Sequence, residues 1–438
     1  MRISVFGMGY VGSVSSAALA RNGHTVVGVD VDPNKLQLLD EGRSPVVEPG
    51  LDVLIRDCTA SGRLSVTSNP SEAVLLSDLS WICVGTPGRA DGSVDLSALE
   101  IVCQQIGQAM SEKAAYHTVV LRSTVLPGTV RDRVIPWLEE CSGLSAGEDF
   151  GICMSPEFLR EGSALEDFTR PAFTLIGEFD PESGDAATKS YEGVEAPVVR
   201  TAIETAEMVK YVGNAFHGLK VVFANEIGNI AKAHGIDGQE VMELFGRDTH
   251  LNISTAYLKP GFAFGGSCLP KDTRALVHRA NDIGIDVPVL EAVMESNEMQ
   301  IRRAIQMVEH SGRKRVGVLG LSFKAGTDDV RESPVVPLIE TLVGRGYEVL
   351  VYDEDVQLDS LIGANKAFVE AEIPHIASLM RPGLEEVVEG SEVVVVSNGS
   401  KSYEDVLHRI RDDQLIIDLV GIAKGQGSTM GEYEGICW

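Results

Sequence analysis

The sequence predicts an α/β protein in which two doubly wound sheets, one in each outer part of the chain, are joined by an all-helical middle with one long helix. Two observations carry this prediction. Short apolar segments alternate with helical patterns in both outer parts, and a proline-free stretch of helical periodicity lies between them. The 438 residues suffice for about three domains. We expect these domains to span 1–200, 201–310 and 311–438.

The first domain contains five short apolar segments that predict buried strands. They are Arg2–Phe6, Thr25–Asp30, Leu79–Val84, Thr118–Ser123 and Phe150–Met154. Helix-length patterns separate these segments. Because parallel strands must be joined by crossovers of about a dozen residues or more, this alternation favours a parallel, doubly wound sheet.

A glycine turn, GMGYVG at 7–12, follows the first expected strand and precedes a helical run of small residues. Gly7 would allow the tight turn, Gly9 the approach of a pyrophosphate, and Gly12 the close packing of helix on strand. Asp30 ends the second strand, where a carboxylate would accept hydrogen bonds from ribose hydroxyls and repel a 2′-phosphate. The pattern predicts a Rossmann-like domain that binds NAD rather than NADP. A glycine turn of some other α/β domain is the alternative.

Three further polar residues are expected near the dinucleotide. Lys35 is close enough in sequence to Asp30 to assist at the ribose or phosphate, although a solvated lysine is the alternative. Thr86 in VGTP and Thr124 in RSTVLPGT follow the next two strands. The carboxyl ends of such strands line the ligand crevice of an open sheet.

The middle of the chain begins with an uninterrupted helical pattern from Thr201 to about His234. A helix of ~34 residues would be ~50 Å long, a length typical of a domain connector or a dimer interface. Further helices are expected at Gly238–Phe245, Cys268–Ile283 and Leu290–Val308.

Four polar residues share one face of the long helix: Lys210, Asn214, His217 and Asn225. At ~100° per residue they fall within an arc of about 80°. If that face is buried, these groups need partners, either the acids of SPEFLREG (155–162) or a ligand in a pocket. A lysine one turn from an asparagine would suit a substrate hydroxyl as its proton leaves. His217 alone would be typical of a core histidine.

Cys268 lies in FGGSCLPKD (264–272), where two glycines precede an expected helix start with Pro270 in its first turn. A thiol at a helix N-terminus beside Lys271 should have a lowered pKa and act as a nucleophile. Asp272 is four residues further on, one turn along the same face. The alternative is a buried structural cysteine.

The α/β pattern resumes at Arg315, with apolar segments at 315–321, 347–353, 392–398 and 414–420. These segments predict a second, smaller Rossmann-like sheet. The closing residues GEYEGICW (431–438) are expected to be loosely ordered.

Two loops carry basic residues that could offset the charge of a diphosphate. These bases are Lys259 in YLKPGFAFGG (257–266), which also carries Tyr257 and Phe262 into the glycine loop, and Lys324 and Arg331 in FKAGTDDVRESP (323–334). Taken singly, each base would also be typical of solvated surface charge.

Composition argues against several classes of function. The formal net charge of −27 would repel nucleic acid and anionic membranes, although solubility alone would explain it. The seven cysteines form no C-x-x-C pair, so neither a zinc site nor a disulfide framework is predicted, and no other metal site. No run of ~18 apolar residues is present, and the early glycine turn argues against a cleaved signal. We therefore expect a cytoplasmic protein.

These strings together resemble the UDP-glucose/GDP-mannose dehydrogenase family over essentially the whole chain. The resemblance is carried by the Lys210–Asn214 pair and by GMGYVG, EPGL (48–51), CVGTP, RSTVLPGT, SPEFLREG, NEIGNIAK, PGFAFGGSCLPKD and LSFKAGTDDVRESP. The cysteine string is highly specific, whereas the glycine turn by itself is not. Within the family, FAFGGSCLPKD, FKAGTDDVRES and the GICW ending favour GDP-mannose as the substrate.

The resemblance implies a two-fold oxidation of a nucleotide sugar at C6, from alcohol to carboxylate, with two NAD. It also implies a homodimer or higher homo-oligomer with shared active sites. Cys268 would capture the aldehyde as a thiohemiacetal, and a second hydride transfer would leave a thioester that water hydrolyses. The other implied catalytic residues, which would stabilise oxyanions or serve hydrolysis, are Lys210, Asn214, Asp272, Glu161 and Thr124.

The resemblance also assigns binding positions. With the three glycines Gly7, Gly9 and Gly12, the implied cofactor positions are Tyr10, Val11, Asp30, Lys35, Thr86, Thr124, Lys271 and Arg331. The implied substrate positions are Glu161, Lys210, Asn214, His217, Asn225, Tyr257, Lys259, Phe262, Gly265 and Lys324. Two positions depart from the GDP-mannose pattern, since Ala256 stands for a tyrosine and Lys259 for an arginine. These changes would reshape contacts reached from the neighbouring subunit.

Three other functions compete with this interpretation. Within the family, the substrate could be UDP-glucose. A two-electron hydroxyacid dehydrogenase would share the dinucleotide domain and a Lys-x-x-x-Asn pair, but it needs neither Cys268 nor a second nucleotide-type domain. A nucleotide-sensing or scaffolding protein would have no use for a nucleophile, so intact Cys268, Lys210 and Asp272 argue against it.

Overall fold

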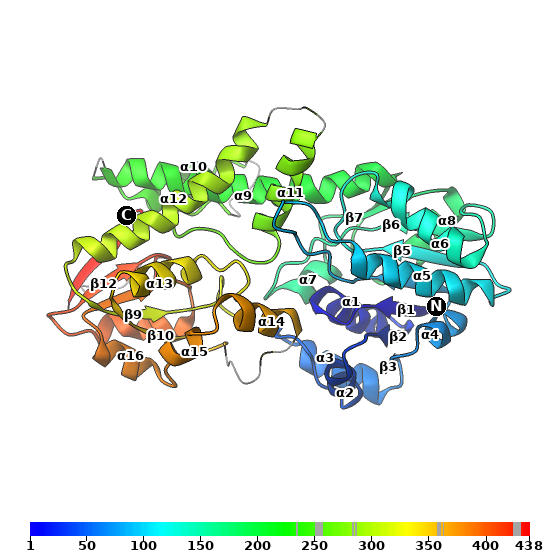
Figure 1. The fold of residues 1–438 in the computed structure, drawn as a ribbon, viewed down its shortest axis with the longest axis horizontal. Helices are drawn as coiled ribbons and strands as arrows, with labels where there is room; N and C mark the ends of the chain where they lie inside the picture. The colour runs from blue at the N-terminus through cyan, green and yellow to red at the C-terminus, as the bar shows by residue number, and fades with distance from the viewer. Residues whose placement is uncertain are drawn as a thin grey trace. The chain divides into compact units, whose positions relative to one another are not determined.

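The structure is a computed structural model that describes residues 1–233, 235–249, 257–282, 284, 287–356, 361, 363–423 and 431–438. These residues form two compact units, Met1–Gly213 and Asn214–Trp438. Figure 1 labels their helices and strands and follows the chain by colour from blue to red.

The first unit is built on an eight-stranded sheet with the order β3-β2-β1-β4-β5-β6-β7-β8. Every neighbouring pair is parallel except β6 and β7. The strands are β1 Arg2–Phe6, β2 Thr25–Val29, β3 Leu64–Thr67, β4 Leu79–Ile82, β5 His117–Leu121, β6 Phe150–Met154, β7 Thr174–Glu178 and β8 Val198–Ala202. The five predicted strands are confirmed as β1, β2, β4, β5 and β6. The sequence did not predict β3, β7 or β8; of these, β3 and β8 form the partly exposed edges, where a strand lacks a continuous apolar run.

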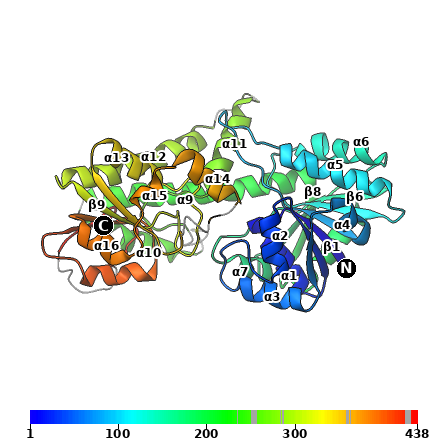
Figure 2. The same cartoon turned by 60° about the horizontal axis from the view of Figure 1, so that its bottom comes forward.

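Helices cover both faces of this sheet, as a doubly wound fold requires. Side chains of α1, α3, α7 and α8 pack in the core on one face, and those of α4, α5 and α6 in the core on the other. Figure 2 shows α5 and α6 on one side of the strands and α1 and α3 on the opposite side. The helices are α1 Tyr10–Arg21, α2 Pro33–Asp40, α3 Leu51–Ala60, α4 Pro70–Leu76, α5 Ser97–Ser111, α6 Ile135–Ser142, α7 Ala164–Thr169 and α8 Pro181–Ser190.

The predicted long helix is α9, Ile203–Ala233. It begins two residues later than expected because β8 continues to Ala202. Its 31 residues correspond to about 47 Å at 1.5 Å per residue. The following helices also agree with the predicted segments: α10 Gly238–Gly246, α11 Leu269–Asp282 and α12 Pro288–His310.

The second unit contains a five-stranded, all-parallel sheet with the order β10-β9-β11-β12-β13. Its strands are β9 Arg315–Leu319, β10 Glu348–Tyr352, β11 Val393–Val396, β12 Leu415–Asp418 and β13 Glu432–Gly435. Side chains of α12 and α13 (Val335–Gly344) pack on one face, and those of α16 (Leu384–Gly390) and η3 (Lys401–His408) on the other. The short helices α14 Gly363–Glu372 and α15 Ile376–Leu379 complete this unit. The predicted fold class is therefore confirmed.

The expectation of a loosely ordered tail was wrong. Residues Glu432–Gly435 form β13, which pairs with β12 in parallel. The next two side chains, Ile436 and Cys437, are fully buried. Gln300 Nε2 donates to Cys437 Sγ at 3.4 Å, and Lys232 Nζ donates to the Gly435 carbonyl at 2.6 Å. The tail is ordered by partners that lie far away in the sequence, which local composition does not reveal.

The two sheets share the design of their first turn. In the first unit Gly7 has a φ of +92°, and the N–H of the next residue donates to Asp30 at 2.7 Å. In the second unit Gly320 has a φ of +101°, and the N–H of the next residue donates to Asp353 at 2.6 Å. In each case a carboxylate at the end of the second strand holds a glycine turn at the end of the first.

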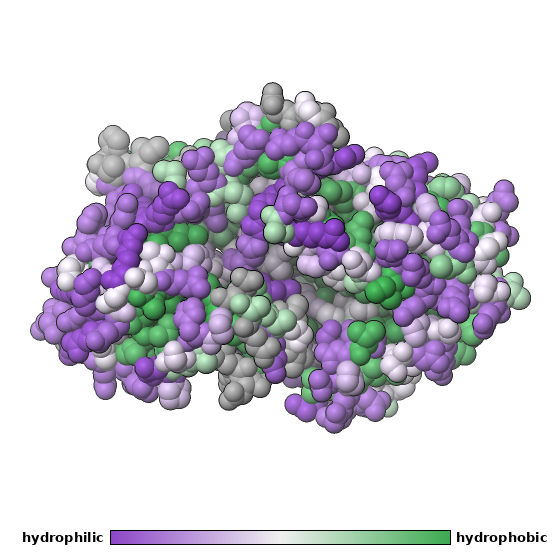
Figure 3. Space-filling model, in the orientation of Figure 1, coloured by the Kyte–Doolittle hydropathy of each residue, from purple (hydrophilic) through white to green (hydrophobic). Residues whose placement is uncertain are grey.

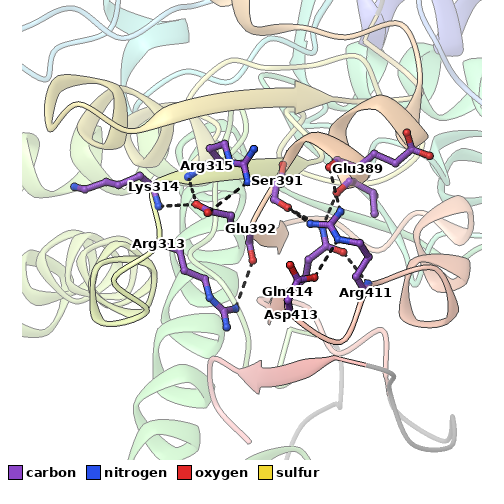
Figure 4. A network of polar contacts seen from close by, with 10 residues as sticks. Arg313, Lys314, Arg315, Glu389, Ser391, Glu392, Arg411, Asp413 and Gln414 are labelled. Carbon is purple, nitrogen blue, oxygen red and sulfur yellow. Dashed lines mark hydrogen bonds and ion pairs between the residues drawn. The ribbon is translucent and has the colours of Figure 1, made fainter.

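A polar network ties together the amino ends of β9, β11 and β12 (Figure 4). Glu392 accepts the backbone N–H groups of Lys314 and Arg315, both at 3.1 Å. Gln414 Nε2 donates to the Ser391 carbonyl at 2.7 Å. Parallel sheets bind ligands at their carboxyl ends, so this network supports the sheet rather than a ligand site.

Hydrophilic residues cover most of the face that Figure 3 shows. This distribution agrees with the net charge of −27. Among the helices of the described residues, none is both long and apolar enough to cross a membrane.

Candidate active site

The glycine turn between β1 and α1 fits a dinucleotide. A Cβ atom on Gly12 would lie 1.8 Å from the Gly7 carbonyl oxygen, so only glycine lets the helix pack this closely on the turn. A Cβ on Gly9 would meet nothing within 4 Å, which leaves this side of the turn open. The helix α1 begins without a side-chain cap. Its first N–H groups, which include those of Tyr10 and Val11, therefore suit an anionic phosphate.

Asp30 is fixed at the carboxyl end of β2. Its Oδ2 accepts the Met8 N–H at 2.7 Å and lies 3.1 Å from Lys35 Nζ, while its Oδ1 accepts the Asp32 N–H at 2.9 Å. A carboxylate offers about four acceptor positions, so about one is left for a ribose hydroxyl. The structure thus brings together the two residues predicted at the ribose. Lys35 also offsets part of the negative charge that would repel a 2′-phosphate.

The carboxyl ends of β4 and β5 are joined beside this turn. Thr86 Oγ1 donates to the Thr124 carbonyl at 2.6 Å, and Ser123 Oγ donates to the Val84 carbonyl at 2.6 Å. A Cβ on Gly7 would lie 3.0 Å from Val84. Because β1 lies between β2 and β4, the strand order reverses here, and ligands of open sheets bind at such a point.

Glu48 is a central residue that the sequence analysis did not single out, although it lies in EPGL. Its carboxylate is buried and accepts hydrogen bonds from the Tyr10 hydroxyl and from the N–H groups of Gly162 (2.7 Å) and Ala164 (2.8 Å). Burial, and then the bond to Glu48, raises the pKa of Tyr10. Glu48 therefore fastens the segment that carries Glu161 to the first turn of α1.

Lys210 forms a buried ion pair with Glu157. Its Nζ lies 2.7 Å from Glu157 Oε1, and the two side chains are 4% and 8% exposed. Burial alone would raise the pKa of Glu157, but the positive charge of Lys210 and its hydrogen bond hold that pKa below its ordinary value. Lys210 therefore has one of the acids of SPEFLREG as a partner, as the first of the two alternatives predicted.

The second unit brings together four residues predicted around the nucleophile. Asn214 Nδ2 donates to Asp272 Oδ2, and Lys271 Nζ lies 2.8 Å from Asp272 Oδ1. Asp272 is 1% exposed, whereas Cys268 is exposed and directly precedes α11. The Asp272 N–H donates to the Cys268 carbonyl at 2.8 Å. An accessible thiol thus lies at a helix N-terminus, one turn from a buried carboxylate; its lowered pKa stays a prediction.

The rings of His217 and Tyr257 stack with centroids 4.5 Å apart and an interplanar angle of 16°. Lys220, which the sequence analysis missed, is buried with its Nζ 5.2 Å from the centroid of Tyr257 and 5.1 Å from that of Phe216. Burial lowers the pKa of Lys220. His217 is therefore part of a cationic and aromatic cluster, which helical spacing alone did not indicate.

The glycine loop before Cys268 is held by predicted residues. Asn225 Oδ1 accepts the Gly261 N–H at 2.8 Å, and Asn225 Nδ2 donates to the Phe262 carbonyl at 3.1 Å. A Cβ on Gly265 would lie 2.4 Å from the Glu332 carbonyl oxygen. Asn225 and Gly265 thus shape this loop, and their contact with a substrate stays a prediction.

The remaining predicted bases lie in the second unit. Arg331 makes a two-pronged contact with Asp329, at 2.9 Å through Nε and 2.6 Å through Nη2. Lys259 and Lys324 are exposed. Ala256 lies outside the described residues.

Three family models match successive parts of the chain. They are the NAD binding domain of the UDP-glucose/GDP-mannose dehydrogenase family over residues 1–195, its central domain over 204–299 and its UDP binding domain over 317–425. The chain is also 50% identical over 438 residues to a GDP-mannose 6-dehydrogenase of Pseudomonas aeruginosa, with 100% of both chains covered.

Solved structures of two dehydrogenases are also similar to this chain over its whole length. A UDP-glucose dehydrogenase from the hyperthermophilic archaeon Pyrobaculum islandicum is similar with a TM-score of 0.90 and 36% identity, over 100% of this chain and 98% of that chain. A ternary complex of GDP-mannose dehydrogenase from Pseudomonas aeruginosa is similar with a TM-score of 0.58 and 49% identity, over 100% of both chains.

Proposed function

This chain belongs to the UDP-glucose/GDP-mannose dehydrogenase family, and on that premise we propose that it oxidises GDP-mannose at C6 to the carboxylate. NAD is its cofactor, as the glycine turn predicted. The identity of 50% to a GDP-mannose 6-dehydrogenase, against 36% to a UDP-glucose dehydrogenase, supports GDP-mannose as the substrate.

One observation carries the chemical part of the proposal. The exposed Cys268 directly precedes α11, and Asp272 in the first turn of that helix bonds to both Asn214 and Lys271. A thiol at this position can reach a substrate, and the buried polar groups beside it can orient an oxygen atom or a water molecule. A two-electron dehydrogenase would need no such thiol.

The first half of the reaction turns the C6 alcohol into an aldehyde. The carbon would lose a hydride, for which NAD held at the glycine turn would supply the acceptor, and the oxygen would lose its proton to water. Lys210 and Asn214, one turn apart on α9, supply an ammonium and an amide to the oxygen as negative charge develops on it. The ion pair with Glu157, at 2.7 Å, fixes the direction of the Lys210 side chain.

The second half needs a covalent bond. Cys268 Sγ adds to the aldehyde carbon, and the carbonyl oxygen takes up the proton that the thiol releases. The same carbon then gives a hydride to a second NAD, and the oxygen gives its proton to water, which leaves a thioester. Water adds to the thioester and the C–S bond breaks, one proton of the water restores the thiol, and the other is released to solvent as the acid ionises to the carboxylate. In this proposal Asp272, with Glu161 and Thr124, serves the hydrolytic step.

We also propose that the protein acts as a homodimer that uses the apolar face of α9. Phe216 and Phe223 are 37% and 42% exposed on this helix. Phe245 of α10 is 39% exposed and lies 6.1 Å from Phe223 between ring centroids, and the neighbouring Leu244 is 56% exposed. A patch of large apolar side chains on a soluble enzyme marks an interaction surface. Exchange of Phe223 for aspartate should shift the sedimentation of the protein from dimer to monomer, and an unchanged dimer would exclude this face.

The decisive experiment for the reaction compares the yield of NADH from limiting GDP-mannose and limiting UDP-glucose. We expect two NADH per GDP-mannose, no free aldehyde, and much slower turnover of UDP-glucose. A yield of one NADH per sugar would contradict the thioester mechanism. Faster turnover of UDP-glucose than of GDP-mannose would make UDP-glucose the substrate instead. The cytoplasmic location expected from the sequence stays a prediction.

A further inference from the structure

A buried carboxylate on α9 holds the loop that carries Thr124. Glu207 is fully buried in the first unit. Its Oε2 accepts the Gly128 N–H at 2.7 Å, and its Oε1 accepts the Val130 N–H at 2.9 Å. Both oxygens of one side chain are thus used on one short segment. Neither the sequence motifs nor the reaction proposed above gives this residue a role.

The segment in question is a tight turn that leads from β5 into a helical stretch. The Thr129 N–H donates to the Leu126 carbonyl at 3.0 Å, and Gly128 has a φ of +91°. With Pro127 before Gly128, this is the geometry of a type II turn. The π-helical turn η1 (Val130–Val134) follows at once and continues into α6. The N–H groups at such a helix start need an outside acceptor, and Glu207 supplies it.

The other end of the loop is fixed independently. Thr86 Oγ1 donates to the Thr124 carbonyl, as described above, and Val125 is fully buried. The loop from Thr124 to Val130 is therefore held by a threonine at its start and by Glu207 at its end.

We propose that Glu207 is a positioning residue, whose carboxylate holds the loop from Thr124 to Val130 in the conformation that cofactor binding at Thr124 requires. The inference rests on the proposed function for the role of Thr124. Glu207 acts only through the backbone of this loop. It also lies one turn before Lys210 on α9, so a single rigid helix fixes both the loop and the lysine.

The ionisation of Glu207 gives the proposal a distinctive signature. Burial raises the pKa of Glu207 to about 7, and the nearby carboxylates of Glu204 and Asp132 add to this effect, although the two N–H bonds oppose it. Arg131 faces the same helix turn but is paired with Glu204. Protonation turns one acceptor oxygen into a hydroxyl donor, so the neutral acid can no longer accept both N–H groups well. A glutamine at this position resembles the neutral acid at every pH.

The test compares Glu207→Gln with the wild type and with a matched control. Glu204→Gln removes a carboxylate one turn earlier on the same helix, where the side chain is 37% exposed. At pH 8.5 we expect Glu207→Gln to lower kcat/KM for NAD by about 10- to 100-fold, since a misplacement of about 1 Å can cost about 100-fold. Glu204→Gln should leave it unchanged. At pH 6 the wild type and Glu207→Gln should converge, because the wild-type carboxyl is then protonated too. A purely structural defect would give the same ratio at both pH values.

Hydrogen exchange of the wild type provides a second measurement that requires neither substrate nor a folded variant. After correction for intrinsic rates, the Gly128 and Val130 amides should be protected at pH 8.5 and less protected at pH 6. Equal protection at both pH values, or full activity of Glu207→Gln at pH 8.5, would overturn the proposal. Failure of the wild type to oxidise GDP-mannose, with the exchange result intact, would instead contradict the proposed function.

Discussion

Exchanging Glu157 for glutamine tests how much the buried ion pair with Lys210 contributes to stability. The chain offers a matched pair for comparison. Glu157 and Lys210 are 2.7 Å apart with side chains 8% and 4% exposed, whereas Glu204 and Arg131 are 2.6 Å apart with side chains 37% and 60% exposed. The distances are nearly equal, so the difference between the two pairs is burial.

Burial sets the expected magnitude. Removing one partner of a buried pair leaves an uncompensated charge and costs about 3–5 kcal/mol, while an exposed pair contributes about 0–1 kcal/mol. We therefore expect Glu157→Gln to lower the free energy of unfolding by about 3–5 kcal/mol. For Glu204→Gln we expect less than about 1 kcal/mol.

The assay is urea unfolding of the full chain, followed by circular dichroism, with the shift in midpoint read at unchanged slope. The pKa of Glu157 is held below its ordinary value of 4.5. The pair therefore stabilises the fold above that pH, and its contribution is lost as the pH falls through the lowered pKa. The difference between wild type and Glu157→Gln should shrink in acid. If Glu157→Gln shifted the midpoint no more than Glu204→Gln does, the argument from burial would be refuted.

Three further predictions follow from the site and the core. Cys268→Ala should abolish formation of the C6 carboxylate (the uronate) while leaving NAD binding and the first oxidation intact. Mass spectrometry of wild-type protein quenched during turnover should find a sugar adduct on the peptide that contains Cys268. If the variant still made the uronate at the original rate, Cys268 would have a structural role only. Asp30→Ala should narrow the preference for NAD over NADP, chiefly by weakening the binding of NAD, and binding titrations with both cofactors would measure this. Because Lys35 lies 3.1 Å from Asp30, we expect only a modest gain in the affinity for NADP. Equal use of both cofactors by the wild type would show that Asp30 is not at the ribose. Burial, and then the charge of Lys113, lowers the pKa of His117 to about 3. The free energy of unfolding should therefore fall by about 1.4 kcal/mol per pH unit as the pH drops below ~6.5. His117→Asn should remove this dependence on pH in urea unfolding at several pH values, and an unchanged dependence would assign it to other groups.

Local sequence was sufficient for the features that depend on neighbours in the chain. The glycine turn at 7–12 and Asp30 follow from steric needs within one strand–turn–helix unit, and the structure shows both as predicted. The long helix follows from apolar periodicity and the buried parallel strands from short apolar runs, because both patterns record which side chains leave water. The fold class and the cofactor were predicted on this basis, the family was predicted from the resemblance of its motifs, and all three are confirmed.

Only the tertiary structure decided which partner each buried polar group takes. Glu48, Glu157 and Glu207 are buried carboxylates whose donors lie far along the chain, at Tyr10 and Gly162, at Lys210, and at Gly128 and Val130. For this reason Glu48 and Glu207 were not singled out from the sequence, and Glu157 was considered only as one of the acids of SPEFLREG. A buried charge must find such partners, but spacing along a helix or strand does not say where they are. The ordered tail has the same cause, since Cys437 is buried against side chains of α9 and α12. The sequence by itself determined most of the elements and the glycine turn and predicted a nucleophile, while the long-range pairing of its buried polar groups appeared only when the chain was folded.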